Sequence, residues 1–114
     1  MDDVLVTTWL TLPEVAERLD VPVTRARQLV KDRQLLAVRR GDGNAVMVPA
    51  EMVQDGRVLK GLPGVLTLLH DAKFSDDEAL RWLYTDDGLP GSPVQALAEN
   101  RGTEVKRRAQ ALGF

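Results

Sequence analysis

The stretch VPVTRARQLVKDRQLLAVRRGDGN, residues 21–44, carries most of the information about this chain. It holds six of the 15 Lys and Arg residues and only two of the 17 Asp and Glu residues. The whole chain of 114 residues has a formal net charge of −2. Because the total charge is close to zero, only its distribution can indicate a surface that meets a polyanion.

The residues just before this stretch predict a capped helix. Thr11 is a favoured N-cap residue, and Pro13 is favoured in a first helical turn. One buried stripe with the spacing i, i+3, i+4, i+7 is formed by Leu12, Val15, Ala16 and Leu19. Asp20-Val21-Pro22 is expected to break this helix, and residues 1–8 are expected to form a short tail or an edge strand.

A second helix is predicted from about Val23 to Asp32. At about 100° per residue, its apolar face consists of Val23, Ala26, Leu29 and Val30, and its opposite, polar face consists of Thr24, Arg27, Gln28 and Lys31. Arg25 lies on the flank between the two faces. We expect the apolar face to pack on the first helix and the polar face to meet solvent.

A β-hairpin is predicted directly after the second helix. Residues 36–40 and 45–49 are β-rich runs, and they flank the turn Gly41-Asp42-Gly43-Asn44. Arg39 and Arg40 belong to the first of these strands. The order is therefore helix, tight turn, helix with a basic polar face, and hairpin.

The rest of the chain predicts helices. Residues 49–53 can start a helical turn, and residues 54–61 are expected to form a connector. After the connector, helical stripes end in Leu69, in Tyr84, in Ala98 and in Leu112, the last with Val105 and Ala109 inward. Ser75 and Glu78 form a predicted capping box. The fold class is thus mainly α with a small β-hairpin wing, in two domains, residues 1–56 and 57–114.

A helix that presents Arg and Gln fits the major groove of double-stranded DNA and can donate hydrogen bonds to base edges. A basic hairpin beside it can reach phosphates or the neighbouring minor groove. An ordinary solvated helix face is the alternative, because Lys and Arg are common on outer faces. The joint occurrence of the two helices, the hairpin and one sign of charge favours DNA binding.

The stretch LPEVAERLDVPVTRARQLVKDRQLLAVRR resembles the winged helix-turn-helix of excisionase-like and MerR-like DNA-binding domains. Two later stretches, KGLPGVLTLLHDAKFSDDEALRWLYT and ALAENRGTEVKRRAQALGF, resemble the C-terminal domain of a small actinobacterial family of winged-helix DNA-binding proteins. The resemblance implies a winged helix-turn-helix followed by a helical domain. It also implies that the wing is Arg39 to Asn44. The sequence departs from the family pattern at Pro22, where such domains often have a capping Ser.

These observations give the predicted function and site. The chain is predicted to be a double-stranded DNA-binding transcriptional regulator without enzymatic activity. Thr24, Arg27 and Gln28 are predicted to face base edges. The predicted phosphate contacts are Arg25, Lys31, Arg33, Arg39 and Arg40, and Asn44 belongs to the wing.

A protein-interaction role is the second hypothesis. Trp82-Leu83, Gly91-Ser92-Pro93 with Leu97, and Gly102 with Val105 resemble the C-terminal domain of Xre/ParS-type antitoxins. This resemblance implies an antitoxin or adaptor whose helical half binds a partner protein.

Several chemistries find no support in the sequence. The chain has no cysteine and one histidine, His70, so we predict no metal site, and no nucleotide-binding or nucleophile motif predicts a cofactor or an enzyme. No apolar run is long enough to span a membrane, and Met1-Asp2-Asp3 is acidic where a secretory signal is basic. We therefore expect a cytoplasmic, nucleoid-associated protein, and a monomer because no heptad pattern is present.

Thr7 and Thr8 are candidate phosphorylation sites for a kinase. They precede the first helix in the expected tail, where a phosphate would add about −1.5 to −2 charges. Near the basic face, this charge would compete with DNA phosphates for Arg and Lys.

Overall fold

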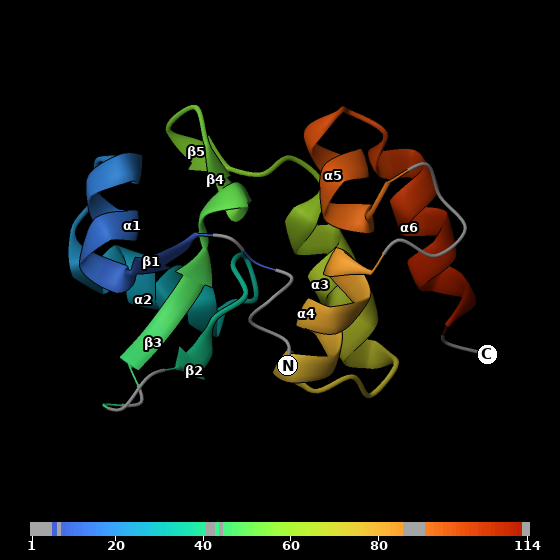
Figure 1. Ribbon diagram of the computed structural model, residues 1–114, viewed down its shortest axis with the longest axis horizontal. Coiled ribbons are helices and arrows are strands. Elements are labelled where there is room, and N and C mark those ends of the chain that lie inside the picture. Colours follow the sequence, from blue (N-terminus) through green and yellow to red (C-terminus); the bar gives the residue numbers. More distant parts are fainter. Residues whose placement is uncertain (1–5, 7, 41–42, 44, 86–90, 113–114) are drawn as a thin grey trace.

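The computed structural model describes residues 6, 8–40, 43, 45–85 and 91–112. In Figure 1, the elements of the N-terminal half, which include a small sheet, lie on one side, and the helices of the C-terminal half lie on the other. The N-terminal elements are β1 (Trp9–Thr11), α1 (Leu12–Leu19), α2 (Val23–Lys31), β2 (Val38–Arg40), β3 (Ala45–Pro49) and the 3₁₀ turn η2 (Ala50–Met52). They are followed by β4 (Val53–Gln54), β5 (Arg57–Val58), α3 (Leu62–Asp71), α4 (Asp76–Tyr84), α5 (Pro93–Ala98) and α6 (Gly102–Ala111).

Thr11 ends β1 and caps α1 at the same time. The Glu14 backbone N–H donates to Thr11 Oγ1 at 3.3 Å, and the Thr11 N–H donates to Glu14 Oε1 at 2.8 Å. The two bonds that Glu14 Oε1 accepts, from the Thr11 backbone N–H and, at 3.1 Å, from the Thr11 hydroxyl, hold the pKa of Glu14 below its ordinary value. The predicted cap is therefore confirmed, and it joins the sheet to α1 with no intervening loop.

The packing of α1 on α2 follows the predicted stripes. Val15 and Ala16 of α1 are buried, as are Ala26 and Leu29 of α2, and Ala26 has no exposed surface. Asp20 ends α1 in the left-handed conformation, with φ 58°, which turns the chain between the two helices. The two predicted helices and the break between them are confirmed.

The sheet contains one more strand than the predicted hairpin. Its order is β1-β3-β2, all antiparallel, with Leu10 opposite Val48 and Arg39 opposite Val46. The predicted strand over residues 36–40 was too long, because Leu36 and Ala37 are buried in the core before the ladder begins at Val38. A tail or an edge strand was predicted over residues 1–8, and the strand β1 lies directly after them, at Trp9–Thr11.

The connector predicted over residues 54–61 is wrong in its first half. β4 and β5 form a second antiparallel hairpin, with Val53 opposite Val58 and Gln54 opposite Arg57. Its two-residue turn, Asp55-Gly56, has φ of 53° and 75°, the positive values that a tight hairpin turn needs. The Asp-Gly pair is a strong hairpin signal in the sequence, but the flanking strands are too short to show alternation.

The four C-terminal helices bury most of the predicted stripes, but Ala98 of the third stripe is exposed and Ala96 is buried instead. The buried residues include Leu62, Val65, Leu66, Leu69, Leu80, Leu83, Val94, Leu97, Val105 and Ala109. The Ser75–Glu78 capping box is present, and its bonds lower the pKa of Glu78, with the Ser75 backbone bond as the main cause. Leu112 was predicted to point inward, but it is 37% exposed, because α6 ends one residue before it.

The two halves of the chain share one hydrophobic core. At the seam between them, the Tyr84 hydroxyl of α4 donates to Glu51 Oε1 of η2 at 2.7 Å. Burial raises the pKa of Tyr84, and the bond to Glu51 and the charge of that carboxylate add to the shift. The phenol is therefore a neutral donor that ties α4 to the winged half.

Tyr84→Phe is expected to destabilise the fold by about 1–3 kcal/mol, because it leaves the half-buried Glu51 carboxylate without its donor. Urea unfolding followed by circular dichroism measures this. Thr85→Val is the matched control, since it removes an exposed hydroxyl that donates to the Arg81 carbonyl at 2.6 Å within the same helix end. Equal losses in the two variants would contradict a special role for the seam bond.

Candidate nucleic-acid interface

The polar face of α2 is exposed as predicted. Thr24, Arg27, Gln28 and Lys31 are exposed, and so is Arg25 on the flank. Ala26 and Leu29, on the opposite side, are buried against the rest of the winged half. The helix is thus fixed along one side and presents a row of hydrogen-bond donors along the other.

The start of α2 is set by the backbone rather than by a side-chain cap. Pro22 is the N-cap residue, with φ −64°, and it makes no capping hydrogen bond through its side chain. Its carbonyl oxygen accepts the N–H groups of Arg25 at 2.9 Å and Ala26 at 3.2 Å. The departure at Pro22 from the usual Ser is therefore compatible with a helix that begins at Val23.

Gln28 is held by a side-chain bond within the helix. Its Nε2 donates to Asp32 Oδ1 at 2.9 Å, one turn further along. A glutamine amide has two donor hydrogens and an acceptor oxygen. Gln28 can therefore pair with an adenine edge, which needs one donor and one acceptor, and still keep its bond to Asp32.

Arg33 follows α2 in a conformation that is unusual for a residue with a side chain. It is exposed and has φ 58°, in the left-handed region. The Arg33 N–H donates to the Val30 carbonyl at 3.2 Å, and the Gln34 N–H donates to the Leu29 carbonyl at 2.8 Å. A glycine would adopt this conformation at lower cost, so the position holds an arginine at some expense in stability.

The two arginines of β2 lie on opposite faces of the sheet, because side chains alternate along a strand. Arg40 lies over the ring of Trp9 in β1, with its guanidinium carbon 4.3 Å from the ring centroid, a cation–π contact. Arg39 is exposed and pairs with Val46 across the ladder. Although the two arginines are neighbours in the sequence, their side chains therefore leave the sheet from opposite faces.

Part of the predicted site lies outside the described residues. This holds for Asn44 of the wing turn and for Thr7. Gly43, between the strands, is exposed. Thr8 is exposed too, and its carbonyl oxygen accepts the Ala50 N–H at 3.0 Å, so its backbone is tied to the start of η2. Its side chain shares a shallow depression with Arg18, Glu51 and Asp55, and not with α2.

The start of α4 brings acidic residues beside the basic residues Arg33 and Arg39 of the candidate interface. Asp76 and Asp77 line one depression together with Arg39 and Val30, and Asp76 also lines a smaller one together with Arg33. In the sequence these acids are typical of a first helical turn, which their place in α4 confirms. Their position beside the basic residues depends on the packing of the two halves, and nothing local in the sequence indicates it.

Two absences concern the described residues only. Within residues 6, 8–40, 43, 45–85 and 91–112, no three His, Asp or Glu side chains are grouped as metal ligands. No helix among the same residues combines the length and apolar character needed to cross a membrane.

The arrangement of α1, α2 and the β2–β3 hairpin is that of a winged helix-turn-helix, with α2 as its second helix and the hairpin in the position of the wing. Two family models match the chain. The model described as the winged helix-turn-helix domain of the DNA-binding protein Rv2175c matches residues 1–53, and the model described as the Rv2175c C-terminal domain of unknown function matches residues 59–113.

Individual proteins give the same result. DNA-binding protein Rv2175c of Mycobacterium tuberculosis is 41% identical over 116 residues, which cover 90% of this chain and 79% of the relative. An NMR structure of Rv2175c has a TM-score of 0.82 and 39% identity, over 94% of this chain and 82% of that one. The chain therefore belongs to the Rv2175c family, and the resemblance to an actinobacterial winged-helix family is confirmed.

Ala26→Leu is expected to destabilise the fold by about 1–3 kcal/mol, because three extra carbons must enter the core at a position with no exposed surface. The measurement is the free energy of urea unfolding. Ala111→Leu, at the exposed end of α6, is the control with the same change in size and should have little effect. A neutral Ala26→Leu would mean that α2 is not held as described.

Proposed function

We propose that this protein binds double-stranded DNA by inserting α2 into the major groove. The observation that carries the proposal is the exposed row of Thr24, Arg27 and Gln28 on a helix whose other side is buried. An α-helix fits the major groove, and Arg and Gln pair with guanine and adenine edges there. The relative Rv2175c is named a DNA-binding protein, which supports the same conclusion.

The surrounding basic residues are proposed to hold the phosphate backbone. Arg25 and Lys31 flank the reading face of α2, and Arg33 follows its end. Arg39 and Arg40 would contact phosphates from the wing, with Arg40 oriented by Trp9. Such contacts fix the position of the protein on the duplex but do not themselves read sequence.

Residues 1–56 are proposed to form the DNA-binding part and residues 57–114 the part that supports and modulates it. Because the proposed action is binding, we assign no reaction to the protein. Its proposed role is regulation of transcription on chromosomal DNA in the cytoplasm, as a monomer.

Binding to a duplex should weaken steeply with salt. For about four to six neutralised phosphates, the slope of log K against log salt concentration should be about −4 to −5. Fluorescence anisotropy with a labelled duplex at several salt concentrations measures this slope. Arg107→Gln, on exposed α6, should leave the slope unchanged. A flat salt response, or no binding to any duplex at low salt, would refute the proposal.

Arg33→Gly separates DNA binding from stability. Glycine adopts the positive φ of residue 33 without the steric strain that an arginine has there, so the fold should be as stable as before or more stable. It removes one phosphate contact, so the salt slope should become shallower by about one unit. Lys73→Gly is the matched control, because Lys73 also has a positive φ after a helix, at 73°, and is not a predicted contact. Equal weakening by both variants would contradict the assignment of Arg33.

We also propose that phosphorylation of Thr7 or Thr8 by a kinase weakens DNA binding. The supporting observation is the exposed side chain of Thr8 next to Arg18. The Thr7→Glu/Thr8→Glu variant should bind one duplex about twofold or more weakly than Thr7→Ala/Thr8→Ala at fixed salt, because added negative charge repels DNA. Equal affinities, together with unchanged affinity after phosphorylation by a kinase in vitro, would rule the switch out.

A further inference from the structure

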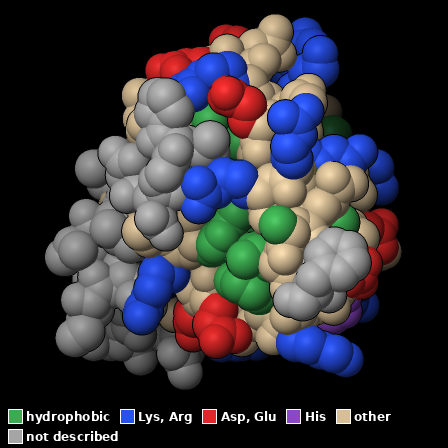
Figure 2. Space-filling view, turned by 90° about the vertical axis from the view of Figure 1, so that its right-hand side faces the viewer, with side chains coloured by type: hydrophobic (Ala, Val, Ile, Leu, Met, Phe, Trp, Pro, Cys, Tyr) green, Lys and Arg blue, Asp and Glu red, His purple; other side chains and the backbone are tan. Residues whose placement is uncertain are grey.

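The helical half contains a cavity of about 340 Å³ that the DNA-binding surface does not use. Its lining residues come from the end of the α3–α4 loop, from α4, and from α5 and α6: Phe74, Glu78, Arg81, Trp82, Thr85, Pro93 and Arg108. Figure 2 shows this side of the molecule, where apolar surface is bordered by Lys and Arg side chains and, along part of its edge, by Asp and Glu side chains. The volume falls within the range of about 300–1,000 Å³ that is usual for small-molecule sites.

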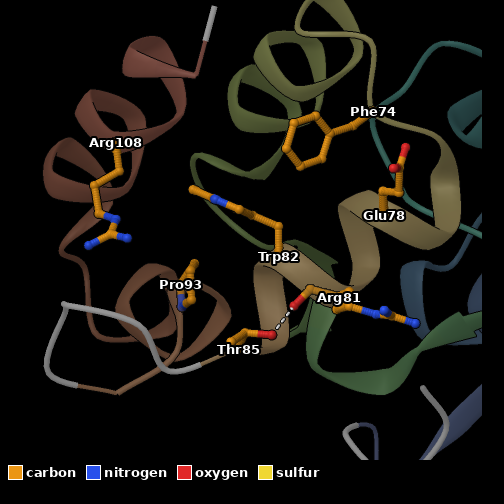
Figure 3. Close-up of a pocket in the computed structure, with 7 residues that line it drawn as sticks. All are labelled: Phe74, Glu78, Arg81, Trp82, Thr85, Pro93 and Arg108. Atoms are coloured by element: carbon orange, nitrogen blue, oxygen red, sulfur yellow. Dashed lines mark hydrogen bonds between the residues drawn. The ribbon is translucent and has the colours of Figure 1, made fainter. Parts of the chain in front are cut away.

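Three of the lining residues, Phe74, Trp82 and Pro93, give the cavity flat, apolar walls. In Figure 3, Trp82 reaches from α4 toward α6, with Phe74 on one side and Pro93 on the other. Trp82 and Phe74 are only half-buried although each packs against the core, so the rest of each ring is available to an occupant. Aromatic walls of this kind favour a flat, apolar group that can stack or meet them edge-on.

The polar groups around the cavity select the charge of the occupant. The Glu78 carboxylate accepts the Ser75 N–H at 2.8 Å and so belongs to the helix cap. The Thr85 hydroxyl donates to the Arg81 carbonyl, a bond drawn in Figure 3. The Thr85 hydroxyl hydrogen is therefore engaged within the helix end, whereas Glu78 keeps its negative charge, at the end of the cavity away from Arg108 (Figure 3).

Two arginines line the cavity, and Arg108 is the one whose guanidinium lies on the side of Trp82 and Pro93, whereas the guanidinium of Arg81 points away from Trp82 (Figure 3). The Arg108 side chain reaches from α6 toward the space beside Trp82 and Pro93 (Figure 3). Among the described residues, no carboxylate forms an ion pair with Arg108. A guanidinium offers two parallel N–H groups that match a carboxylate, so the complementary ligand carries an anionic group next to its flat apolar body.

We propose that this cavity binds a small aromatic carboxylate, with the ring against Trp82, Phe74 and Pro93 and the carboxylate on Arg108. This would make the helical half a ligand-binding domain attached to a DNA-binding one. The assignment does not depend on the proposed DNA contacts, because α6 and α2 lie at opposite ends of the molecule (Figure 1).

The test is a titration of the ¹⁵N-labelled full chain with 2-naphthoate, followed by NMR. The chain has two tryptophans, Trp9 and Trp82, so two indole N–H signals are expected, and Trp82→Phe assigns them. The Trp82 signal should shift and saturate below roughly 5 mM naphthoate, whereas the Trp9 signal should not move. The neutral analogue 2-naphthalenemethanol should bind about tenfold more weakly, because it lacks the charge-assisted bonds to Arg108.

Arg108→Gln should weaken naphthoate binding by about tenfold and leave the weak binding of the alcohol unchanged. Arg107→Gln, on the same helix but outside the cavity, is the control and should change neither. The absence of saturation, equal binding of acid and alcohol, or an unaffected Arg108→Gln variant would overturn the proposal. A Trp82 signal that shifts with protein concentration alone would overturn it as well, since a second copy would then cover the cavity.

Discussion

The burial of Ala26 in α2, which packs on α1, is the constraint on which the proposed DNA interface depends. Ala26 has no exposed surface, and neither has Val15 in α1, so the two helices approach each other through small and branched side chains. Burying one side of α2 in this way fixes which residues point outward. Arg27 and Gln28 face solvent because Ala26 and Leu29 cannot.

The fixed backbone at each end of the two helices maintains that contact. Thr11 joins β1 to α1 through a capping box, and Asp20 in the left-handed conformation turns the chain into α2. Pro22 supplies the carbonyl that begins α2, and Arg33, in the left-handed conformation, turns the chain after its end. The sheet then places Arg40 against Trp9 of the first strand, so the wing is tied to the same framework. A framework fixed in this way favours the proposed binding of DNA, because little conformational entropy of the backbone has to be lost on binding.

The sequence predicted what depends on local pattern. The stripes of α1 and α2, the caps at Thr11 and Ser75, and the exposed face of α2 all follow from helical periodicity and from side chains that bond to nearby backbone. The β4–β5 hairpin was missed because two-residue strands have no detectable period, although Asp55-Gly56 marks its turn. Leu112 was misplaced because the stripe continues past the residue at which α6 ends.

The features that arise from contacts between distant segments could not be predicted. The bond from Tyr84 to Glu51 joins residues 33 positions apart. The acidic start of α4 lies beside Arg39 only because the two halves share a core. The cavity around Trp82 and Arg108 also needs α4 and α6 to be neighbours. For these features the sequence supplies the residue types, and the packing supplies the arrangement.

The most direct test of the account is an NMR titration of the ¹⁵N-labelled chain with a short DNA duplex, in which the backbone amide shifts are mapped onto the structure. The account predicts that the largest shifts occur along α2, from Thr24 to Lys31, with further shifts in β2 at Arg39. It predicts little change along α6, which lies at the far end of the molecule (Figure 1). Largest shifts on α4 to α6, with α2 unaffected, would contradict it.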